Sequence, residues 1–328
     1  MIDREIQLAL VAEAAQSPSV HNVQPARWRF AGDTLLLFED VRRRLPAGDP
    51  SGRDTGVSLG AASEGMAIAL SARGWNLTEI MPDAGIAVPD HLRVARAFRL
   101  VAGAKIDLLH AQLGKRYSHR GAFAKATVAD HKAAEDLAND DLAVITDDHR
   151  LPIIGRVYDA ASLRFFRDDA FRAELLSWMR LSPRHPQWAI DGLNADAMAM
   201  SRIEAVGAGM VLGPRAFPVF DRLGLAGPLT GEAARVTASA GVLVLHRADD
   251  EDPFATGRAF YRHWLGVVAA GFQGAVMAAL ADDAQAQATL AALAQVPKGR
   301  RIVTTLRIGR MTGEPPKRAR LEVDDLLV

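Results

Sequence analysis

QSPSVHNVQP, residues 16–25, lies between an amphipathic N-terminal pattern and a strand-like run that begins at Trp28. Pro18 and Pro25 cannot continue a helix, and each favours an extended residue before it, so the stretch is predicted to be a loop. Its donors and acceptors are closely spaced on Ser19, His21, Asn22 and Gln24. Such a set suits recognition of the edge of a planar heteroaromatic ring. It also suits an ordinary helix-to-strand connection whose side chains bond their own backbone.

The composition limits the classes of function. The chain has 328 residues, enough for a large core, and 39 Lys and Arg residues balance 39 Asp and Glu residues. This balance argues against nucleic acid or an anionic membrane as a partner. The absence of cysteine excludes disulfides, thiolate catalysis and cysteine-ligated metals. The N-terminus carries charges within its apolar pattern and has no signal-peptide core, so a cytoplasmic protein is expected.

The run Trp264–Ala281 contains no charged residue. It is at the short end of the roughly 20 residues that span a bilayer, and it contains Gln273. A helix buried on all sides in a soluble protein explains the run better than a membrane span does, and we expect one long helix over Thr256–Ala281.

Periodicity predicts an α+β chain. Helices are expected at Ile2–Gln16, Thr55–Arg73, Val128–Asn139, Leu151–Met179, Thr256–Ala281 and Asp283–Ala294. Strands are expected in a hairpin over Trp28–Asp40 and at Asn76–Ile80, Leu92–Ala102, Leu142–Thr146, Ala240–His246 and Arg301–Arg310. The order helix, polar loop, strand, small-residue helix, strand occurs in 1–103 and again in 104–328. This order predicts two halves of similar topology within one domain, 1–328.

The second half carries a loop-rich insertion, Leu181–Leu229, with most of the later prolines and a glycine cluster. A long insertion of this kind is often a lid over a pocket or an arm of a dimer. The alternative is a surface excursion without function.

Two basic motifs stand apart from the rest of the sequence. In KRYSHR, Lys115–Arg120, the residues Arg116 and Arg120 are four apart and flank Ser118. If the segment is helical or turn-like, both guanidinium groups point the same way, which matches a phosphate dianion. A solvated basic turn is the alternative. A second cluster, Lys317–Arg320, would project Arg318 and Arg320 to one side of an extended segment.

Together the motifs resemble those of the FMN-dependent nitroreductase superfamily. Its typical subunit has R-[RT]-S-x-R near the start, then [SA]-P-S-x-x-N-x-Q-P-W, and a short basic motif near the end. These proteins are usually homodimers with each FMN at the interface, its phosphate held by one subunit and its ring approached by the SPSxxN loop of the other.

Here SPSVHN lies in the first half and RYSHR in the second, so each half has the motif that the other lacks. The chain is therefore similar to the twin, Acg-like subgroup, in which one chain imitates the dimer. The stretches RLPAGDPSGR (residues 44–53), WMR (178–180) and DGL (191–193) are similar to that subgroup as well.

The resemblance implies a nitroreductase-like fold of antiparallel-rich sheets packed by helices, with one complete FMN site per chain. By the same resemblance Arg116, Ser118, Arg120, Arg318 and Arg320 would hold the FMN phosphate. Pro18, Ser19 and Asn22 would contact the isoalloxazine ring. Arg235 would be the cation near flavin N1 and O2, or else an ordinary surface helix residue.

Two departures from the family pattern are visible. The family's QPW is Gln24-Pro25-Ala26 here, with Trp28 displaced by two residues. Tyr117 stands where Arg or Thr is common, which removes a phosphate contact. The remaining histidines show no metal-binding spacing, so no metal is expected.

The resemblance implies that the chain passes hydride from NADPH or NADH, through flavin N5, to a nitroaromatic, quinone or similar electron-poor small molecule. No side chain is then needed as a catalytic acid. The chain would be a monomer built as a pseudo-dimer, with further self-association left open. The alternatives are a protein that stores or sequesters FMN under the insertion with little turnover, and a flavin-free interaction protein.

Overall fold

The first sheet is formed by residues 26–102 of a computed structural model that describes residues 2–83 and 85–328. Its strands are β1 (Ala26–Ala31), β2 (Thr34–Asp40), β3 (Trp75–Ile80) and β4 (Leu92–Ala102). They pair antiparallel in the order β1-β2-β4-β3. The predicted hairpin is β1 and β2. Helices α1 (Arg4–Ala14) and α2 (Arg53–Ser71) bury their apolar residues against this sheet, around Trp28 and Phe98.

The second sheet repeats this topology. Its strands are β5 (Leu142–Ile145), β8 (Gly241–Ala248), β9 (Gln273–Val276) and β10 (Arg300–Gly309). They pair antiparallel in the order β5-β8-β10-β9, and α11 (Pro253–Ala269) connects β8 to β9 as α2 connects β2 to β3. The predicted α+β class and the duplicated topology are therefore confirmed. That residues 1–328 form a single domain stays a prediction.

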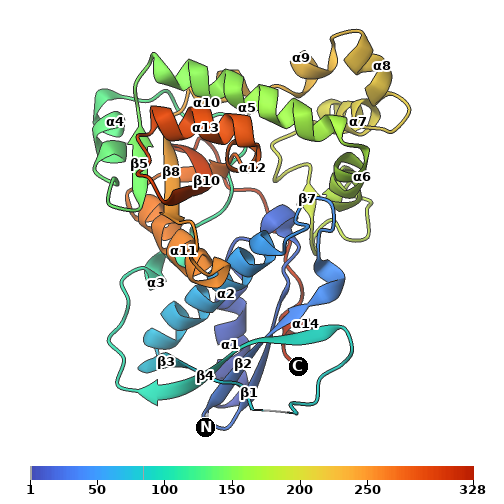
Figure 1. The fold of residues 1–328 in the computed structure, drawn as a ribbon. Helices are drawn as coiled ribbons and strands as arrows, with labels where there is room; N and C mark the ends of the chain where they lie inside the picture. The colour runs from blue at the N-terminus through green and yellow to red at the C-terminus, as the bar shows by residue number, and fades with distance from the viewer. Residues whose placement is uncertain (1, 84) are drawn as a thin grey trace.

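Helices α2 and α11 cross between the two sheets, near the centre of the molecule (Figure 1). A methyl group on Gly60 of α2 would lie 2.0 Å from the carbonyl oxygen of Phe254, and one on Gly257 of α11 would lie 2.0 Å from that of Val57. Each helix thus presents a glycine to the backbone of the other. This reciprocity is the contact pattern of a two-fold dimer interface, here within one chain.

The prediction of one long helix over residues 256–281 is wrong. Helix α11 ends at Ala269, Gly271 has a left-handed φ of 82°, and the chain continues as β9 and then α12 (Ala279–Asp282). A short, fully apolar run does not distinguish a buried helix from a buried strand, so the glycine was the informative signal. No helix among the described residues is long and apolar enough to cross a membrane.

The predicted helix over residues 151–179 is two helices, α5 (Arg150–Arg167) and α6 (Asp169–Trp178). Asp168 separates them, and its carboxylate caps α6 by accepting hydrogen bonds from the N–H groups of Ala170 and Phe171, at 2.8 and 3.0 Å. The remaining helices are α3 (His110–Leu113), α4 (Val128–Glu135), α10 (Ala233–Thr237), α13 (Ala284–Leu293) and α14 (Val323–Leu326).

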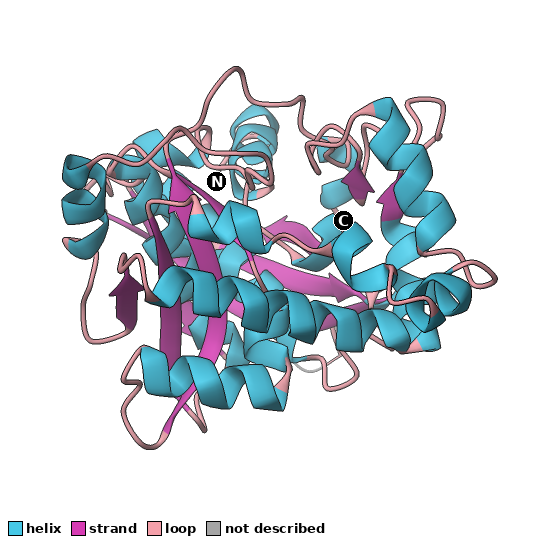
Figure 2. Cartoon of the chain, turned by 90° about the horizontal axis from the view of Figure 1, so that it is seen from above, coloured by secondary structure: helices cyan, strands magenta, loops and turns pink. Residues whose placement is uncertain are grey.

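The insertion 181–229 is more ordered than its composition suggested. Its elements are β7 (Leu193–Asn194), which pairs in parallel with β6 (Met179–Arg180), followed by α7 (Arg202–Val211), α8 (Phe217–Arg222) and α9 (Ala226–Thr230). These elements pack around a small core that includes Phe217. Together with α6 they form a lobe to the side of both sheets (Figures 1 and 2).

The C-terminal tail crosses from the second half to the first. After β10 it passes the end of α1, and α14 packs on α1 and β1. The N–H of Val328 donates to the carbonyl of Trp28 at 2.8 Å. The tail therefore brings residues 316–320 of the second half next to the 16–25 loop of the first.

Candidate functional site

A cavity of about 620 Å³, including its open mouth, lies where four segments of the chain meet. Residues of the 16–25 loop, the 116–120 segment, the 192–197 part of the insertion and the 316–320 tail line it. Eight of the nine predicted site residues are in this lining: Pro18, Ser19, Asn22, Arg116, Ser118, Arg120, Arg318 and Arg320. Arg235 is not in the lining. The structure thus brings the two motif halves together at one place.

The 16–25 loop has an unusual backbone. His21, Asn22 and Gln24 all have left-handed φ angles, of 47°, 57° and 52°. Residues other than glycine rarely adopt this backbone conformation, and it persists only where the surroundings enforce it. Three such residues within four positions indicate a loop held in one shape, which a plain connection does not need.

Amide groups enforce that shape. Asn22 Nδ2 donates to the carbonyls of Gly192 and Ala319, at 3.2 and 3.1 Å. Gln24 Nε2 donates to the carbonyl of Ile190 at 2.9 Å, and its Oε1 accepts from the N–H of Leu321 at 3.0 Å. These amides join loop, insertion and tail, so they are not free to read a ring edge as the sequence suggested.

The 115–120 segment begins in the turn after α3 and then pairs with β9 at Ser118, where the sequence suggested a helical or turn-like clamp. Ser118 forms a parallel bridge with Gly274 of β9, and the N–H of His119 donates to the Gly274 carbonyl at 2.9 Å. Arg116 and Arg120 both line the cavity, on the wall that the 116–120 segment forms. Their charged neighbours differ, because Arg318 lies near Arg116 whereas Glu232 lies near Arg120, so the two arginines do not form one close pair.

Three arginines gather at one end of the wall. Arg116 is 2% exposed, donates to the carbonyl of Gln16 at 2.8 Å, and lies with its Cζ 4.6 Å from the ring centre of Trp264. Arg318 bonds the Gln16 side chain and donates to the carbonyl of Gly114 at 2.7 Å. Arg320 donates to the carbonyl of Ala15 at 2.7 Å and to Asn22 Oδ1 at 2.9 Å. Every one of these acceptors is neutral.

The electrostatics of this end are unbalanced. Burial, with the charges of Arg116 and Arg318, lowers the pKa of Arg320 to about 9, and burial lowers the pKa of Arg116 to about 10. Within the part of the chain that the structure describes, no carboxylate lies within 4.0 Å of a nitrogen of Arg116, Arg318 or Arg320. Buried charge without a partner is unfavourable, so the three-arginine end is suited to an anion.

Arg120 stands apart from that cluster. Burial lowers the pKa of its guanidinium, and the charge of Glu232 opposes the shift. On the other side, burial and the charge of Arg120 lower the pKa of His21 to about 4, so this histidine is neutral at pH 7. Arg235 pairs with Glu232 at 2.6 Å and is partly exposed. It therefore fits the alternative interpretation, an ordinary surface helix residue.

Two further groups support the site. Arg307 of β10 is 1% exposed and donates to the carbonyls of Arg120 and Gly121, at 2.6 and 3.1 Å, which fixes the end of the 116–120 segment. One arginine in an apolar strand pattern gave no signal of this role. Asp191 accepts from Arg180 at 2.8 Å and from Arg43 at 3.1 Å, and so ties the insertion to the first half.

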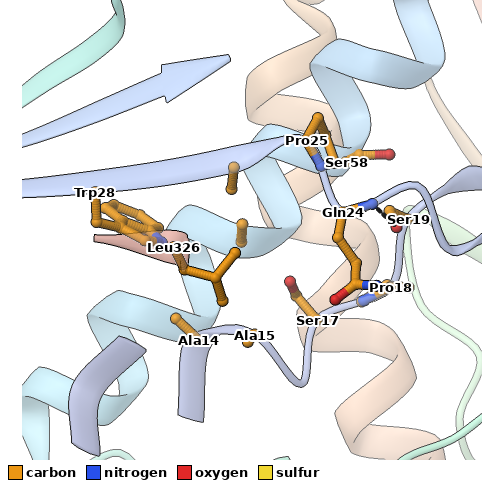
Figure 3. A pocket seen from close by; sticks show the side chains of 12 residues that line it. Ala14, Ala15, Ser17, Pro18, Ser19, Gln24, Pro25, Trp28, Ser58 and Leu326 are labelled. Carbon is orange, nitrogen blue, oxygen red and sulfur yellow. Dashed lines mark hydrogen bonds between the residues drawn. The ribbon is translucent and has the colours of Figure 1, made fainter. Parts of the chain in front are cut away.

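The displaced tryptophan lines a second hollow. This hollow of about 360 Å³ is lined by residues of the loop together with Ala26, Trp28 and Leu326 (Figure 3). Trp28 is 2% exposed, and Leu326 comes from the tail helix α14. In Figure 3 Leu326 lies between Trp28 and the loop, and Ala26 stands at the position where the family has its tryptophan. Among the described residues no group of three or more His, Asp or Glu side chains could hold a metal ion.

Comparison with known proteins gives short matches. No protein-family model matches the chain. A 73-residue stretch is 37% identical to a Mycobacterium tuberculosis protein provisionally named an NAD(P)H nitroreductase, over 22% of this chain and 21% of the relative. A second such protein from that organism, acg, is 36% identical over 74 residues, which cover 23% of this chain and 22% of the length of acg. Over these stretches the chain is similar to proteins named as nitroreductases. The matched part covers only about a fifth of the length of these relatives.

Solved structures of nitroreductases overlap with the chain loosely. One is a Bacteroides fragilis nitroreductase with bound FMN, at a TM-score of 0.36 and 10% identity, covering 65% of this chain and 96% of that one. Another is the Mycobacterium smegmatis nitroreductase NfnB in complex with NADPH, at a TM-score of 0.33 and 16% identity. That match covers 62% of this chain and 89% of NfnB. Overlaps this loose carry no argument about the site. The predicted resemblance to the nitroreductase superfamily is confirmed over the matched stretches, and membership of the twin subgroup stays a prediction.

Proposed function

We propose that this nitroreductase relative binds FMN in the cavity between its halves and acts as an FMN-dependent NAD(P)H oxidoreductase. The observation that carries the proposal is the cluster of Arg116, Arg318 and Arg320, beside a loop held in a strained shape. Among residues 2–83 and 85–328 these three guanidinium groups have no carboxylate partner. Such a donor set fits a phosphate, because guanidinium groups bind phosphate through charge-assisted hydrogen bonds.

The residues present fit the cofactor. Arg116 Nε is buried without a hydrogen-bond partner in the described chain, and Arg116 lines the cavity. In this proposal Arg116, Arg318 and Arg320 hold the phosphate, Ser118 lies along the wall, and Arg120 lies toward the ring with Pro18 and Ser19. That differs from the sequence interpretation, in which Arg120 joined the phosphate clamp.

FMN would supply hydride transfer at N5, and the chain's own groups would orient and tune it. Arg120 would place a positive charge near the ring, which favours electron uptake. The strained loop would fix the ring's position, because Asn22 and Gln24 lock it to the insertion and the tail. The reductant would be NADPH or NADH, and the acceptor a nitroaromatic, quinone or similar electron-poor small molecule.

One observation favours a second function. Gly192, Leu193 and Ala197 of the insertion line the cavity, so the insertion contributes part of its cover. If this cover excludes nicotinamide from the ring, the chain would store or sequester FMN with little turnover. We also propose that 1–103 and 104–328 work as one domain, a monomer with the plan of a dimer.

A turnover assay separates the two functions. The purified chain, loaded with FMN, is mixed with NADPH or NADH and a nitroaromatic under anaerobic conditions. Steady consumption of the reductant supports the oxidoreductase and rules out storage. Bound FMN whose visible absorbance neither reductant bleaches rules out the oxidoreductase, and a chain that binds no FMN rules out both.

A further inference from the structure

The insertion helices α7, α8 and α9 expose more apolar surface than the rest of the chain. Fourteen large apolar residues are exposed among residues 2–83 and 85–328, and seven of these lie within 203–229. Three are on α7, and four lie between Val219 and Leu229, on α8 and α9 or next to them. Helix α8 packs on both other helices, in the lobe beside the two sheets (Figure 1). Scattered exposed apolar residues are ordinary, whereas a gathered set marks a surface that another molecule covers.

Helix α7 has two apolar faces, and only one of them is packed. Ile203, Val206 and Met210 are exposed, and their spacing of three and four residues places them on one face of the helix. Ala205 lies on the opposite face and is buried in the lobe. Gly207 belongs to the exposed face, and a methyl group on it would meet nothing within 4 Å. The lobe therefore builds its own core with one face of α7 and leaves a second apolar face to solvent.

The exposed apolar area matches one side of a protein–protein interface. The exposed fractions of the seven residues run from 45% to 85%. At roughly 120 Å² for a fully exposed aliphatic side chain, they present about 500 Å² of apolar surface. A standard interface buries about 800 Å² of each partner, and somewhat more than half of that area is apolar. The seven residues thus supply the apolar share of one side of a stable interface.

The charges of the insertion favour a protein partner over a membrane. Residues 181–229 contain four arginines, no lysine, and four Asp and Glu residues, so their net charge is zero. A membrane-binding helix surface is rich in Lys and Arg and buries Trp, Phe or Leu, whereas none of the seven exposed residues is aromatic. Protein interfaces are depleted in Lys and enriched in Met and Arg. A neutral apolar surface can also meet a copy of itself without net repulsion.

We propose that two copies of this chain pair through the outer face of α7–α9, with the two α7 helices crossing at a two-fold axis near Gly207. In such an interface the same patch serves both copies, so an apolar, neutral patch is its own complement. A glycine at the crossing lets the two backbones approach, as Gly60 and Gly257 do within the chain. The unit that pairs is the pseudo-dimeric monomer, and the inference does not depend on FMN binding.

Sedimentation equilibrium of the full chain measures this association. We expect a mass twice that of one chain at micromolar concentrations. Val206→Arg would place two like charges against each other near the axis, and it is expected to raise the Kd of the dimer by at least about tenfold. Val128→Arg is the matched control, because Val128 is 87% exposed on α4, outside the lobe. It is expected to leave the Kd unchanged, and circular dichroism checks that both variants fold.

A disulfide test locates the axis, because the chain has no cysteine of its own. A residue near a two-fold axis lies close to its own copy, and a disulfide needs Cα atoms less than about 7 Å apart. Under mild oxidation Gly207→Cys is therefore expected to form a covalent dimer. Val128→Cys is expected to stay a single chain on a non-reducing gel.

Three results would overturn the proposal. They are a wild type that stays monomeric, equal effects of Val206→Arg and Val128→Arg on the Kd, and cross-linking of Gly207→Cys that is no faster than that of Val128→Cys. A monomeric chain that co-sediments with vesicles of phosphatidylglycerol and phosphatidylcholine would assign the surface to a membrane instead.

Discussion

Gly257→Ala tests the pseudo-dimeric plan at the crossing of α2 and α11. The added methyl carbon would lie 2.0 Å from the carbonyl oxygen of Val57 and 2.7 Å from its carbonyl carbon. Both contacts are with backbone, so no side-chain rotation relieves them, and the helices must move apart by about 1 Å to restore contact near 3.3 Å. Overpacking of this kind costs about 1–3 kcal/mol or more.

The substitution also has a favourable part, because alanine is better than glycine in a helix by about 1 kcal/mol. Relief of the clash would pull apart residues packed at the crossing, such as Leu59 and Phe254, so we expect a net loss of about 2 kcal/mol. Urea unfolding followed by circular dichroism measures it, as a lower midpoint with an unchanged slope.

Gly266→Ala is the internal control, because it lies on the same helix and its methyl group would meet nothing within 4 Å. We expect this control to be as stable as the wild type or up to about 1 kcal/mol more stable. If Gly257→Ala unfolds at the same urea concentration as Gly266→Ala, the close helix crossing is refuted.

Three further predictions concern the site. Arg116→Ala is expected to weaken FMN binding by about 10–100-fold through loss of a charged contact, measured by quenching of flavin fluorescence, whereas Arg235→Ala leaves it unchanged; equal effects would contradict the assignment. FMN affinity is expected to be steady from pH 7 to 8 and to fall as pH rises through about 9, because the anion binds protonated Arg320 and that proton is lost above its lowered pKa; an affinity constant to pH 10.5 would count against this role. Asp191→Asn is expected to lower the free energy of unfolding by about 3–5 kcal/mol, because Arg43 and Arg180 would lose the charge that balances them in a buried place; a urea midpoint equal to the wild type's would refute this.

The sequence predicted the placement of the site better than its inner geometry. Two prolines were enough to predict the 16–25 loop, and the split of motifs between the halves was enough to predict that Arg116 and Asn22 meet at one cavity. The duplicated topology followed from element order alone. These features are local, or follow from counting along the chain.

What could not be predicted depends on contacts distant in the chain. The course of the 116–120 segment depends on the bridge between Ser118 and Gly274, about 155 residues away, which spacing within the motif does not reveal. The amide of Asn22 was interpreted as a ligand contact because its partners, Gly192 and Ala319, lie far along the chain. Arg307 has no distinguishing neighbours in sequence, and only the folded arrangement places it beside Arg120.

The stoichiometry of FMN binding tests the central claim most directly. Isothermal titration of the flavin-depleted, full-length chain with FMN is expected to give one FMN per chain. The reason is that the 16–25 loop, the 116–120 segment and the 316–320 tail meet at this one cavity. No detectable binding would contradict the assignment of the cavity. Two equivalent sites per chain would contradict the division of one site between two unequal halves.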